Sequence, residues 1–429
     1  MRVLVVGSGG REHALCWTLA RSASVDEVIA APGNPGIESV GRCVPVDPKD
    51  PAAVAQLADD VDADLVLGGS EESLVRGLVD AVQARGRHAF GPTAAAAHLE
   101  GSKAWMKEVV AEAGVPTARH AAFAAADEDE ALEFLTTLDG LYVVKTDGLA
   151  AGKGVVVTES LDEARDAVRA YLSGAAFGDA GRTLVVEEGM RGPELSLLVV
   201  CNGVVDDAVP LAPAQDFKRI GDGDTGPNTG GMGAYSPVPD AGDDMVDRVM
   251  VEAVRPTLHA LAARGIEYRG ILYAGLMLTS EGPKLVEYNV RFGDPECQVV
   301  VPRLTTDLGE LCRASASGSP LPDVRCTTDA WVTVVLASER YPSSPRTGDV
   351  IEGLDAAGAQ PGVVVFHAGT ARDGEGRLVT AGGRVLNVTA SAPTLGEARD
   401  RAYGAAAMIS WPGMQLRHDI AASAAESPT

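Results

Sequence analysis

The sequence predicts an α/β protein in three parts: an N-terminal doubly wound parallel sheet, a central part with a small sheet of its own, and a C-terminal α+β cap. Three observations predict this. Strand-like and helix-like segments alternate over the first hundred residues. Near residue 120 the pattern of predicted strands and helices changes, and a last section from about residue 328 has its own strands and helix. At about 150 residues per domain, 429 residues allow about three domains.

The first section begins with a β-branched run at 2–6 that passes through a glycine-rich turn into a helix from Arg11. Such alternation is typical of a doubly wound parallel sheet. Further strands are expected at 25–31, 64–69 and 88–91, and helices at 52–59, 71–85 and 102–113, the last of which ends before Gly114 and Pro116.

The central part mixes short strands with helices. We expect strands at 141–148, 154–160, 183–188, 270–278 and 284–292, and helices at 127–138, 161–172 and 243–263. Two strands within 194–210 meet at Asn202-Gly203, which is a hairpin signal. Residues 215–239 are rich in Gly, Pro and Asp without periodicity and predict a long loop. The cap has expected strands at 331–337, 363–367 and 378–389 and a helix at 395–408.

Charge and cysteine usage exclude several classes of function. The chain has 36 basic and 60 acidic residues, a net charge of −24, which disfavours binding to nucleic acid or to an anionic membrane surface. The six cysteines are scattered without a C-x-x-C pair, so they indicate neither a disulfide framework nor a zinc site. No signal peptide or bilayer-spanning run is evident, and we expect a reducing, cytoplasmic location.

The glycine-rich turn at 7–10 places backbone N–H groups at a helix N-terminus, which favours an anion. It is not a dinucleotide fingerprint, because Glu12 occupies the third glycine position and no ribose-binding acid ends the second strand. A tight structural turn is the alternative. The loops 32–36 and 68–73 follow strands at the same edge, where Glu71 could accept sugar hydroxyls, although plain strand-to-helix loops would look the same.

Two lysines and three acids in the central part suggest a nucleotide site. Lys145 ends a strand and Lys153 lies in a glycine-rich turn before the next strand, an arrangement that can cover a triphosphate but is not a Walker loop. The acids at 187, 188 and 194 can accept adenine amino and ribose hydroxyl groups. In an acidic chain they could equally be solvated surface acids.

The stretch 284–296 (KLVEYNVRFGDPE) is the sharpest candidate site. Glu287 and Asn289 share one face of a strand, and their oxygens suit Mg²⁺. Arg291 continues that face and could bind a carboxylate or stabilise phosphoryl transfer. The alternative is a structural ion pair. Asp216 and Lys218 precede a glycine-rich stretch that could close over a site, or could be a disordered insertion.

Taken together, these stretches resemble the ATP-grasp superfamily, and most closely the glycinamide ribonucleotide synthetase (phosphoribosylamine–glycine ligase) family. The resemblance runs nearly end to end and is carried by VLVVGSGGREHAL, APGNPG, GPTAAAAHLEGSKAWMK, KTDGLAAGKGVVV, GPNTGGMGAYSP, YAGLM, EYNVRFGDPECQ, VFHAGT and TAGGRVLNVTA. It implies a substrate-binding domain at 1–101, an ATP-grasp domain at 102–327 with a small mobile lid at about 121–190, and a cap domain at 328–429.

The resemblance also implies an activity. ATP, glycine and 5-phosphoribosylamine would give glycinamide ribonucleotide, ADP and phosphate through a glycyl phosphate, in de novo purine synthesis. Mg²⁺ or Mn²⁺ would be the cofactor and ATP a co-substrate. The partners would be these small molecules, and we expect a monomer that makes transient contacts with neighbouring purine-pathway enzymes.

The family's residue roles fall on matching positions of this chain. Arg291 and Lys145 would be catalytic, with Arg291 on the glycine carboxylate or acyl phosphate, and Glu287 and Asn289 would hold the metal. ATP would contact Lys103, Lys145, Lys153, Glu187, Glu188 and Glu194. Phosphoribosylamine would contact Gly9, Gly10, Arg11, Asn34, Gly36, Glu71, Asp216 and Lys218.

Three departures from the family pattern stand out. The loop usually written Gly-Pro-Glu-Ala-Pro reads GSEES at 69–73, which keeps Glu71 without the prolines. Phe217 replaces a frequent histidine. No acid lies on the strand before the metal strand, so Glu287 would be the only carboxylate on the metal, and we expect weak metal binding without nucleotide.

Three other functions are open from the residues. Another ATP-grasp ligase or carboxylase of the purine pathway would share the fold but would not need GPNTGGMGAYSP. A nicotinamide oxidoreductase built on the first sheet is disfavoured by Glu12. A catalytically inactive purine-binding protein is kept open by the altered loop at 70–73.

Overall fold

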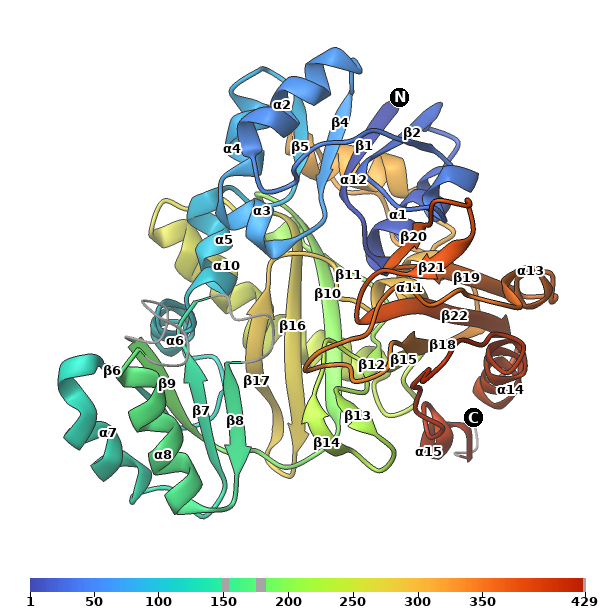
Figure 1. Cartoon of the computed structure of the whole chain (residues 1–429). Coiled ribbons are helices and arrows are strands. Elements are labelled where there is room, and N and C mark those ends of the chain that lie inside the picture. The colour runs from blue at the N-terminus through green and yellow to red at the C-terminus, as the bar shows by residue number, and fades with distance from the viewer. Residues whose placement is uncertain (149–153, 175–182, 427–429) are drawn as a thin grey trace.

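The structure is a computed structural model that describes residues 1–148, 154–174 and 183–426, and it confirms the expected α/β class (Figure 1). The N-terminal sheet is parallel throughout, in the order β3-β2-β1-β4-β5. Its strands are β1 (Arg2–Gly7), β2 (Glu27–Pro32), β3 (Arg42–Cys43), β4 (Leu65–Gly68) and β5 (His88–Phe90). The order reverses at β1, as expected for a doubly wound sheet.

Helices cover both faces of this sheet because successive side chains of each strand point to opposite sides. In β1, Val3 and Val5 pack with Leu15 of α1, whereas Leu4 and Val6 pack with the helices of the other face. These helices are α1 (Gly10–Leu19), α2 (Pro51–Asp60), α3 (Glu71–Val75), α4 (Leu78–Gln83) and α5 (Ala94–Gly101). The single helix expected over 71–85 is two helices, because Gly77 has a φ of 86°.

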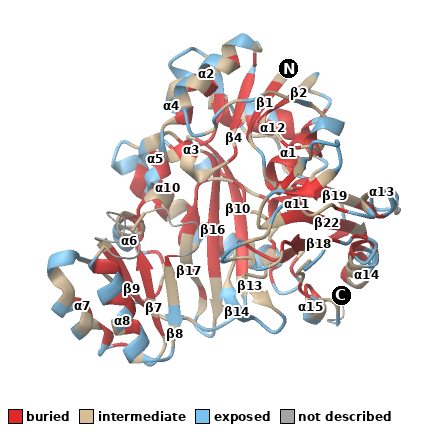
Figure 2. Cartoon of the chain, viewed as in Figure 1, coloured by how far each residue is buried: buried red, intermediate tan, exposed pale blue. Residues whose placement is uncertain are grey.

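A small antiparallel sheet follows, in the order β6-β9-β7-β8. Its strands are β6 (His120–Ala124), β7 (Tyr142–Thr146), β8 (Val155–Thr158) and β9 (Thr183–Glu188). The sheet carries α7 (Glu128–Leu135) and α8 (Leu161–Leu172) on one face, around a separate hydrophobic cluster (Figure 2). α6 (Lys103–Glu112) connects it to the N-terminal part.

The central sheet is antiparallel, in the order β11-β10-β16-β17 (Figure 1). Its strands are β10 (Glu194–Asn202), β11 (Val209–Pro210), β16 (Arg269–Thr279) and β17 (Gly282–Asn289). The expected long helix is observed as α9 (Asp243–Val249), a π-helical turn at Met250–Val254, and α10 (Arg255–Ala263). Tyr288 of β17 fixes this helix to the sheet, because its hydroxyl bonds to Thr257 and to the carbonyl of Ala253.

The C-terminal cap has a five-stranded sheet in the order β12-β15-β18-β22-β19. Its strands are β12 (Gln215–Asp216), β15 (Gly233–Ser236), β18 (Ala330–Ala337), β19 (Val363–His367) and β22 (Arg384–Ala392). Around it lie α11 (Cys297–Val300), α13 (Leu354–Gly358), β20 (Thr370–Arg372), β21 (Leu378–Thr380), α14 (Leu395–Ala406) and α15 (Ala422–Glu426). The helix α12 (Leu308–Ser317) packs instead against β5 of the N-terminal sheet and against β10 and β16 of the central sheet. The single strand expected at 378–389 is two strands, β21 and β22.

The segment 215–239 differs from the loop that the sequence predicts. It contains β12 and β15, which join the cap sheet, and the hairpin of β13 (Arg219–Gly221) and β14 (Thr225–Asn228). Strands of two to four residues are too short to show alternation, and the partner of β15 is β18, about 100 residues further along the chain. No helix in the described ranges is long and apolar enough to cross a membrane.

Two buried histidines join the N-terminal part to the cap. His13 Nδ1 of α1 accepts a hydrogen bond from the backbone N–H of His367 at 2.8 Å. Burial, with His367 nearby, lowers the pKa of His13 to about 3, and burial with Arg372 nearby lowers that of His367 to about 4. Both imidazoles are therefore neutral at pH 7.

This contact predicts acid lability. The unfolded histidines titrate near pH 6.5, well above the folded pKa values, so the stabilisation is complete above about pH 6.5 and is lost as the pH falls toward 4. We expect thermal unfolding measured from pH 7 to pH 5 to show a smaller drop in Tm for His13→Gln than for the wild type. The exposed His259→Gln should retain the wild-type drop. Equal drops in all three proteins would contradict the assignment.

Candidate active site

A β-bulge places the predicted metal-binding residues on the face of β17 away from the core. Gly275 pairs with Glu287 and Leu276 with Leu285, so Val286 is an extra residue in the ladder. One extra residue reverses the alternation of side chains. Leu285 on one side of the bulge and Tyr288 on the other therefore both pack in the core, and Glu287 and Asn289 share the opposite face.

Lys145 brings the small sheet against this bulge. Its ammonium donates to the carbonyl oxygen of Val286 at 3.4 Å and pairs with Glu187 of β9 at 3.0 Å. Glu187 is 2% exposed and also pairs with Lys107 of α6 at 3.2 Å. Burial lowers the pKa of Lys107 to about 8, although Glu187 opposes the shift. Both oxygens of Glu187 thus pair with lysines, and the adenine contact expected for this side chain stays a prediction.

Four cations surround Glu287. Burial disfavours ionisation of this carboxyl, yet Lys218, Lys145, Lys103 and Arg291 together hold its pKa below the ordinary value. Lys103 lies at the start of α6 and donates to the carbonyl of Gly148 at 2.9 Å, while burial lowers its pKa. An ionised carboxylate among positive groups is suited to a bound cation and a polyanionic ligand together.

Arg291 is held from three sides. Its guanidinium donates to Glu100 at 3.0 Å, to the Asn289 side-chain oxygen at 3.1 Å and to Glu71 at 3.3 Å. Burial opposes ionisation of Glu71, but Arg291 and Arg11 lower its pKa to about 2. Burial, with Glu71 and Glu287 adding to it, raises the pKa of Glu100 to about 7. Glu71 begins α3, where Ser70 caps the helix in place of the family's prolines.

Asp216 and Lys218 reach the same cluster from β12 and the residues after it. Lys218 pairs with Glu194 at the start of β10 at 2.6 Å. One carboxylate oxygen of Asp216 is buried without a hydrogen-bond partner among the described residues. Burial raises the pKa of Asp216, with Glu296 and Glu194 adding to the shift and Lys218 opposing it. An unsatisfied buried oxygen is suited to a donor from a ligand.

The residues predicted at the glycine-rich turn lie beside this cluster with partners of their own. Gly9 donates its N–H to Glu12 at 2.6 Å, so the protein's own carboxylate occupies the helix N-terminus in α1. Arg11 pairs with Glu12 at 2.7 Å and donates to the carbonyl of Phe292 at 3.0 Å.

The Asn34 side chain donates to the carbonyls of Ser8 and His367 and accepts from the N–H of Gly36. Gly10 packs so tightly that a Cβ there would lie 2.2 Å from Asn387. Glu188 accepts the N–H of Arg119 at 3.0 Å, at the end of β9. Lys153 lies outside the described residues.

Sequence reasoning missed three residues of the cluster: Lys107, Glu100 and Glu12. Lys107 and Glu100 lie in GPTAAAAHLEGSKAWMK, next to Lys103, and lysine is rare in this chain. The signal for Lys107 was its spacing of four residues from Lys103, which places both side chains on one side of a helix.

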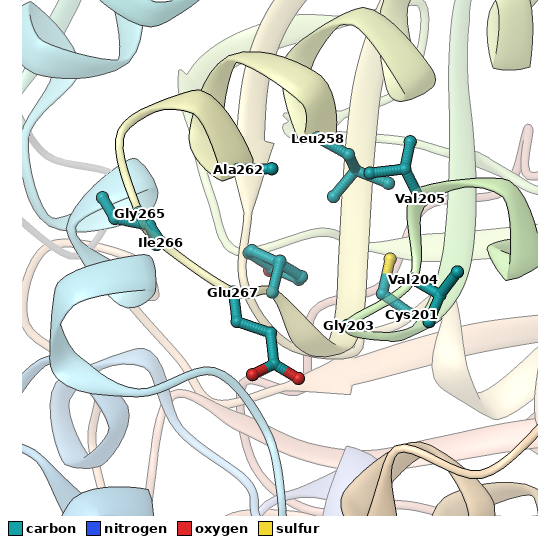
Figure 3. A pocket seen from close by; sticks show the side chains of 10 residues that line it. Cys201, Gly203, Val204, Val205, Leu258, Ala262, Gly265, Ile266 and Glu267 are labelled. Atoms are coloured by element: carbon teal, nitrogen blue, oxygen red, sulfur yellow. The ribbon is translucent and has the colours of Figure 1, made fainter.

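Two cavities have none of Lys145, Glu287 and Arg291 in their lining, although the second is lined by Gly36, a predicted substrate residue. One of about 200 Å³ lies between the turn after β10 and the end of α10, and its walls include Val204, Leu258 and Ile266 (Figure 3). The other, of about 590 Å³, lies between α1 and the cap and includes Gly36, Trp17 and His367. The charged cluster, rather than either cavity, is therefore the candidate active site.

The two sheets that meet at Lys145 and Val286, with the charged cluster between them, define a protein of the ATP-grasp class. The family model "Phosphoribosylglycinamide synthetase, ATP-grasp (A) domain" matches residues 101–297. The N-domain and C-domain models of the same synthetase match residues 1–100 and 331–423. The chain belongs to the phosphoribosylglycinamide synthetase family.

Individual relatives agree with the family. A phosphoribosylamine–glycine ligase of Streptomyces coelicolor is 50% identical over 429 residues, covering 99% of this chain and 100% of that protein. One of Mesorhizobium japonicum is 48% identical over 421 residues, covering 98% and 97%. The crystal structure of the Thermotoga maritima ligase has a TM-score of 0.84 at 33% identity, covering 98% and 100%. A biotin carboxylase–ATP-analogue complex from Campylobacter jejuni, at 16% identity and a TM-score of 0.76, shares the fold.

Proposed function

We propose that the chain ligates glycine to 5-phosphoribosylamine with ATP, giving glycinamide ribonucleotide, ADP and phosphate in purine biosynthesis. The observation that carries the proposal is the gathering of Lys103, Lys145, Lys218 and Arg291 around the ionised Glu287. A full-length relative with that activity in its name, at 50% identity, supports it.

The chemistry needs an activated carboxylate, because a free carboxylate is a poor acyl donor. The γ-phosphoryl group of ATP passes to a glycine carboxylate oxygen with departure of ADP. The resulting glycyl phosphate is attacked by the amine of phosphoribosylamine, which displaces phosphate and loses one proton. Positioning and charge neutralisation suffice for the first transfer. Lys103 and Lys145 would contact the phosphates and Arg291 the glycine carboxylate or acyl phosphate.

We propose the remaining ligand contacts by position. Glu188 and Glu194 would bind the adenosine of ATP, and Glu187 would hold Lys145 in place. Phosphoribosylamine would lie between the glycine-rich turn and the cap, against Gly9, Gly10, Arg11, Asn34, Gly36, Glu71, Asp216 and Lys218. The unsatisfied oxygen of Asp216 supports a donor at that point.

A divalent cation fits Glu287 and Asn289. Their oxygens are hard donors, and no described residue donates a hydrogen bond to the Glu287 carboxylate. When bound, Mg²⁺ or Mn²⁺ would neutralise charge on the phosphates of ATP. The described residues contain no group of three or more His, Cys, Asp or Glu that could hold a metal by themselves. The site therefore depends on oxygens that the nucleotide brings.

This donor set predicts nucleotide-dependent metal binding. Titration calorimetry should detect little heat when Mg²⁺ is added to the protein alone, and clear binding when a non-hydrolysable ATP analogue is present. Glu287→Gln should lose the second signal because the only carboxylate is removed, while exposed Glu133→Gln should retain it. Tight binding of Mg²⁺ to the nucleotide-free protein would contradict the proposal.

We propose a division into substrate-binding (1–101), ATP-grasp (102–327) and cap (328–429) domains, with the small sheet within 121–190 as a lid. The separate hydrophobic cluster of that sheet supports its movement as a unit. We further propose a monomer in the cytoplasm, with transient contacts to neighbouring pathway enzymes. All six cysteines are free, which is consistent with a reducing compartment.

The experiment that tests the function measures phosphate release from ATP with and without glycine and freshly made phosphoribosylamine. Dependence on both substrates is expected. Release that is indifferent to glycine, or that requires bicarbonate instead, would overturn the proposal, and the second result would indicate a carboxylase.

A further inference from the structure

Arg417, in the segment after α14, is a buried arginine of the cap that reaches into the segment carrying Asp216 and Lys218. It is 1% exposed. It pairs with Asp419 of the cap at 2.6 Å and with Asp224 of the β13–β14 hairpin at 2.6 Å. Arg417 is not among the site residues that the family resemblance implies.

Two further contacts of Arg417 lie on either side of Lys218. The guanidinium carbon is 4.9 Å from the centre of the Phe217 ring, and one N–H donates to the carbonyl oxygen of Arg219 at 3.2 Å. A guanidinium can donate in its plane and bind an aromatic face at the same time, which an ammonium cannot do as well. Arg417 therefore holds the residues before and after Lys218.

Other bonds connect the same hairpin to the cap. Asp419 accepts the N–H of Gly223 at 2.8 Å, and Asp222 accepts the N–H of His418 at 2.7 Å. The carbonyl of Lys218 also accepts the N–H of Thr229 at 2.7 Å. With its backbone fixed on both sides, Lys218 is directed toward Glu194 and the candidate active site.

We propose that Arg417 is a positioning residue through which the C-terminal cap sets the place of Lys218 and Asp216 in the active site. The inference rests on the proposed function, and it assigns the cap a part in binding the phosphorylated amine substrate that acts through Lys218 and Asp216. None of the contacts of Arg417 is with Lys103 or Lys145, so its main effect should fall on phosphoribosylamine. A smaller effect on ATP is expected through Glu194, which pairs with Lys218.

The test compares Arg417→Met with Arg346→Met, a matched control. Arg346 is a cap arginine that pairs with Glu339 and Asp349, within the cap. We expect Arg417→Met to raise the KM for phosphoribosylamine at least about 10-fold, since small misplacements of binding groups are costly. Its KM for ATP should rise less than its KM for phosphoribosylamine, because Lys218 reaches the ATP site only through Glu194. The control should leave both constants unchanged.

A second readout does not depend on activity. Hydrogen exchange of the backbone over 215–229 should be faster in Arg417→Met and unchanged in the control. Faster exchange without a selective rise in KM, or no change in exchange, would overturn the proposal. If Arg417→Met does not fold, Asp224→Asn takes its place, because it removes the hairpin's charge of the ion pair at a largely exposed position and keeps a side chain that tolerates the positive φ of 54°.

The two proposals fail in different ways. Wild-type protein without glycine-dependent phosphate release would refute the proposed function. An active wild type whose KM for phosphoribosylamine is unaffected by Arg417→Met would refute only the role of Arg417. Phe217→Leu adds a further check, because its effect should not add to that of Arg417→Met if both act through the same contact.

Discussion

Arg291→Lys is expected to lose most turnover while the protein stays folded. Arg291 donates to Glu71, Glu100 and Asn289, which lie in different directions around one planar group. A lysine keeps the positive charge but lacks the planar guanidinium with its several N–H donors. It therefore cannot donate to these three acceptors and to the substrate at the same time. Loss of one well-placed donor to a developing negative charge costs about 10²–10³-fold in kcat.

The measurement is phosphate release at saturating substrates, with circular dichroism and thermal unfolding to verify the fold. Arg248→Lys is the matched control, because Arg248 makes a surface ion pair with Glu252 at 2.9 Å, on α9 and the turn after it. Wild-type turnover in Arg291→Lys would remove Arg291 from the chemistry. A folded, inactive Arg291→Lys beside an active Arg248→Lys is the expected pair of results.

Glu187→Leu is expected to give the largest loss of stability. The carboxylate is 2% exposed and neutralises Lys107, 1% exposed, and Lys145, 5% exposed. Removing one member of a buried ionic group leaves unpaired charge and costs about 3–5 kcal/mol. Denaturant unfolding at pH 7.5 would measure the change. Glu252→Leu, from the surface ion pair, should change stability by less than about 1 kcal/mol.

A double variant separates charge from packing. If the loss in Glu187→Leu comes from unpaired ammonium groups, adding Lys107→Met should recover part of the stability because one buried charge is removed. Loss of shape alone would make the two changes additive and the double variant less stable still. A Glu187→Leu protein within about 1 kcal/mol of the wild type would contradict the buried-charge account.

Regular elements with strong patterns were predictable from the sequence. β1, β2, β4 and β5 of the first sheet and the helix at 161–172 are observed close to their expected bounds, because each has a pattern that its own residues carry. The two-residue strand β3 was not predicted. The strands within the segment 215–239 were not predictable from the sequence, since β15 is a strand only through its pairing with β18. Gly77, whose positive φ separates α3 from α4, was likewise not distinguished from an ordinary helical glycine.

The candidate site was predictable as a set of residue types but not as a set of pairs. Glu287 and Asn289 were placed on one face from strand alternation, but β17 ends at Asn289, so Arg291 lies after the strand and not on it as expected. The bulge at Val286, which turns this face away from the core, could not be predicted from the sequence. The ion pair of Glu187 with Lys107 could not be predicted, because Lys107 comes from a helix about 80 residues earlier. Spacing reveals neighbours along one element, whereas ion pairs between elements depend on the packing of the whole fold.

The exchange of strands between the central part and the cap has a consequence for dissecting the molecule. Because β12 and β15 precede the cap in sequence but are hydrogen-bonded into its sheet, a cut near residue 328 would not yield two self-sufficient fragments. The upstream fragment would expose the unpaired edge of β15, a template for aggregation, and the downstream fragment would lack two of its strands. Transplanting the cap onto another member of this fold would therefore require moving the 215–239 segment with it.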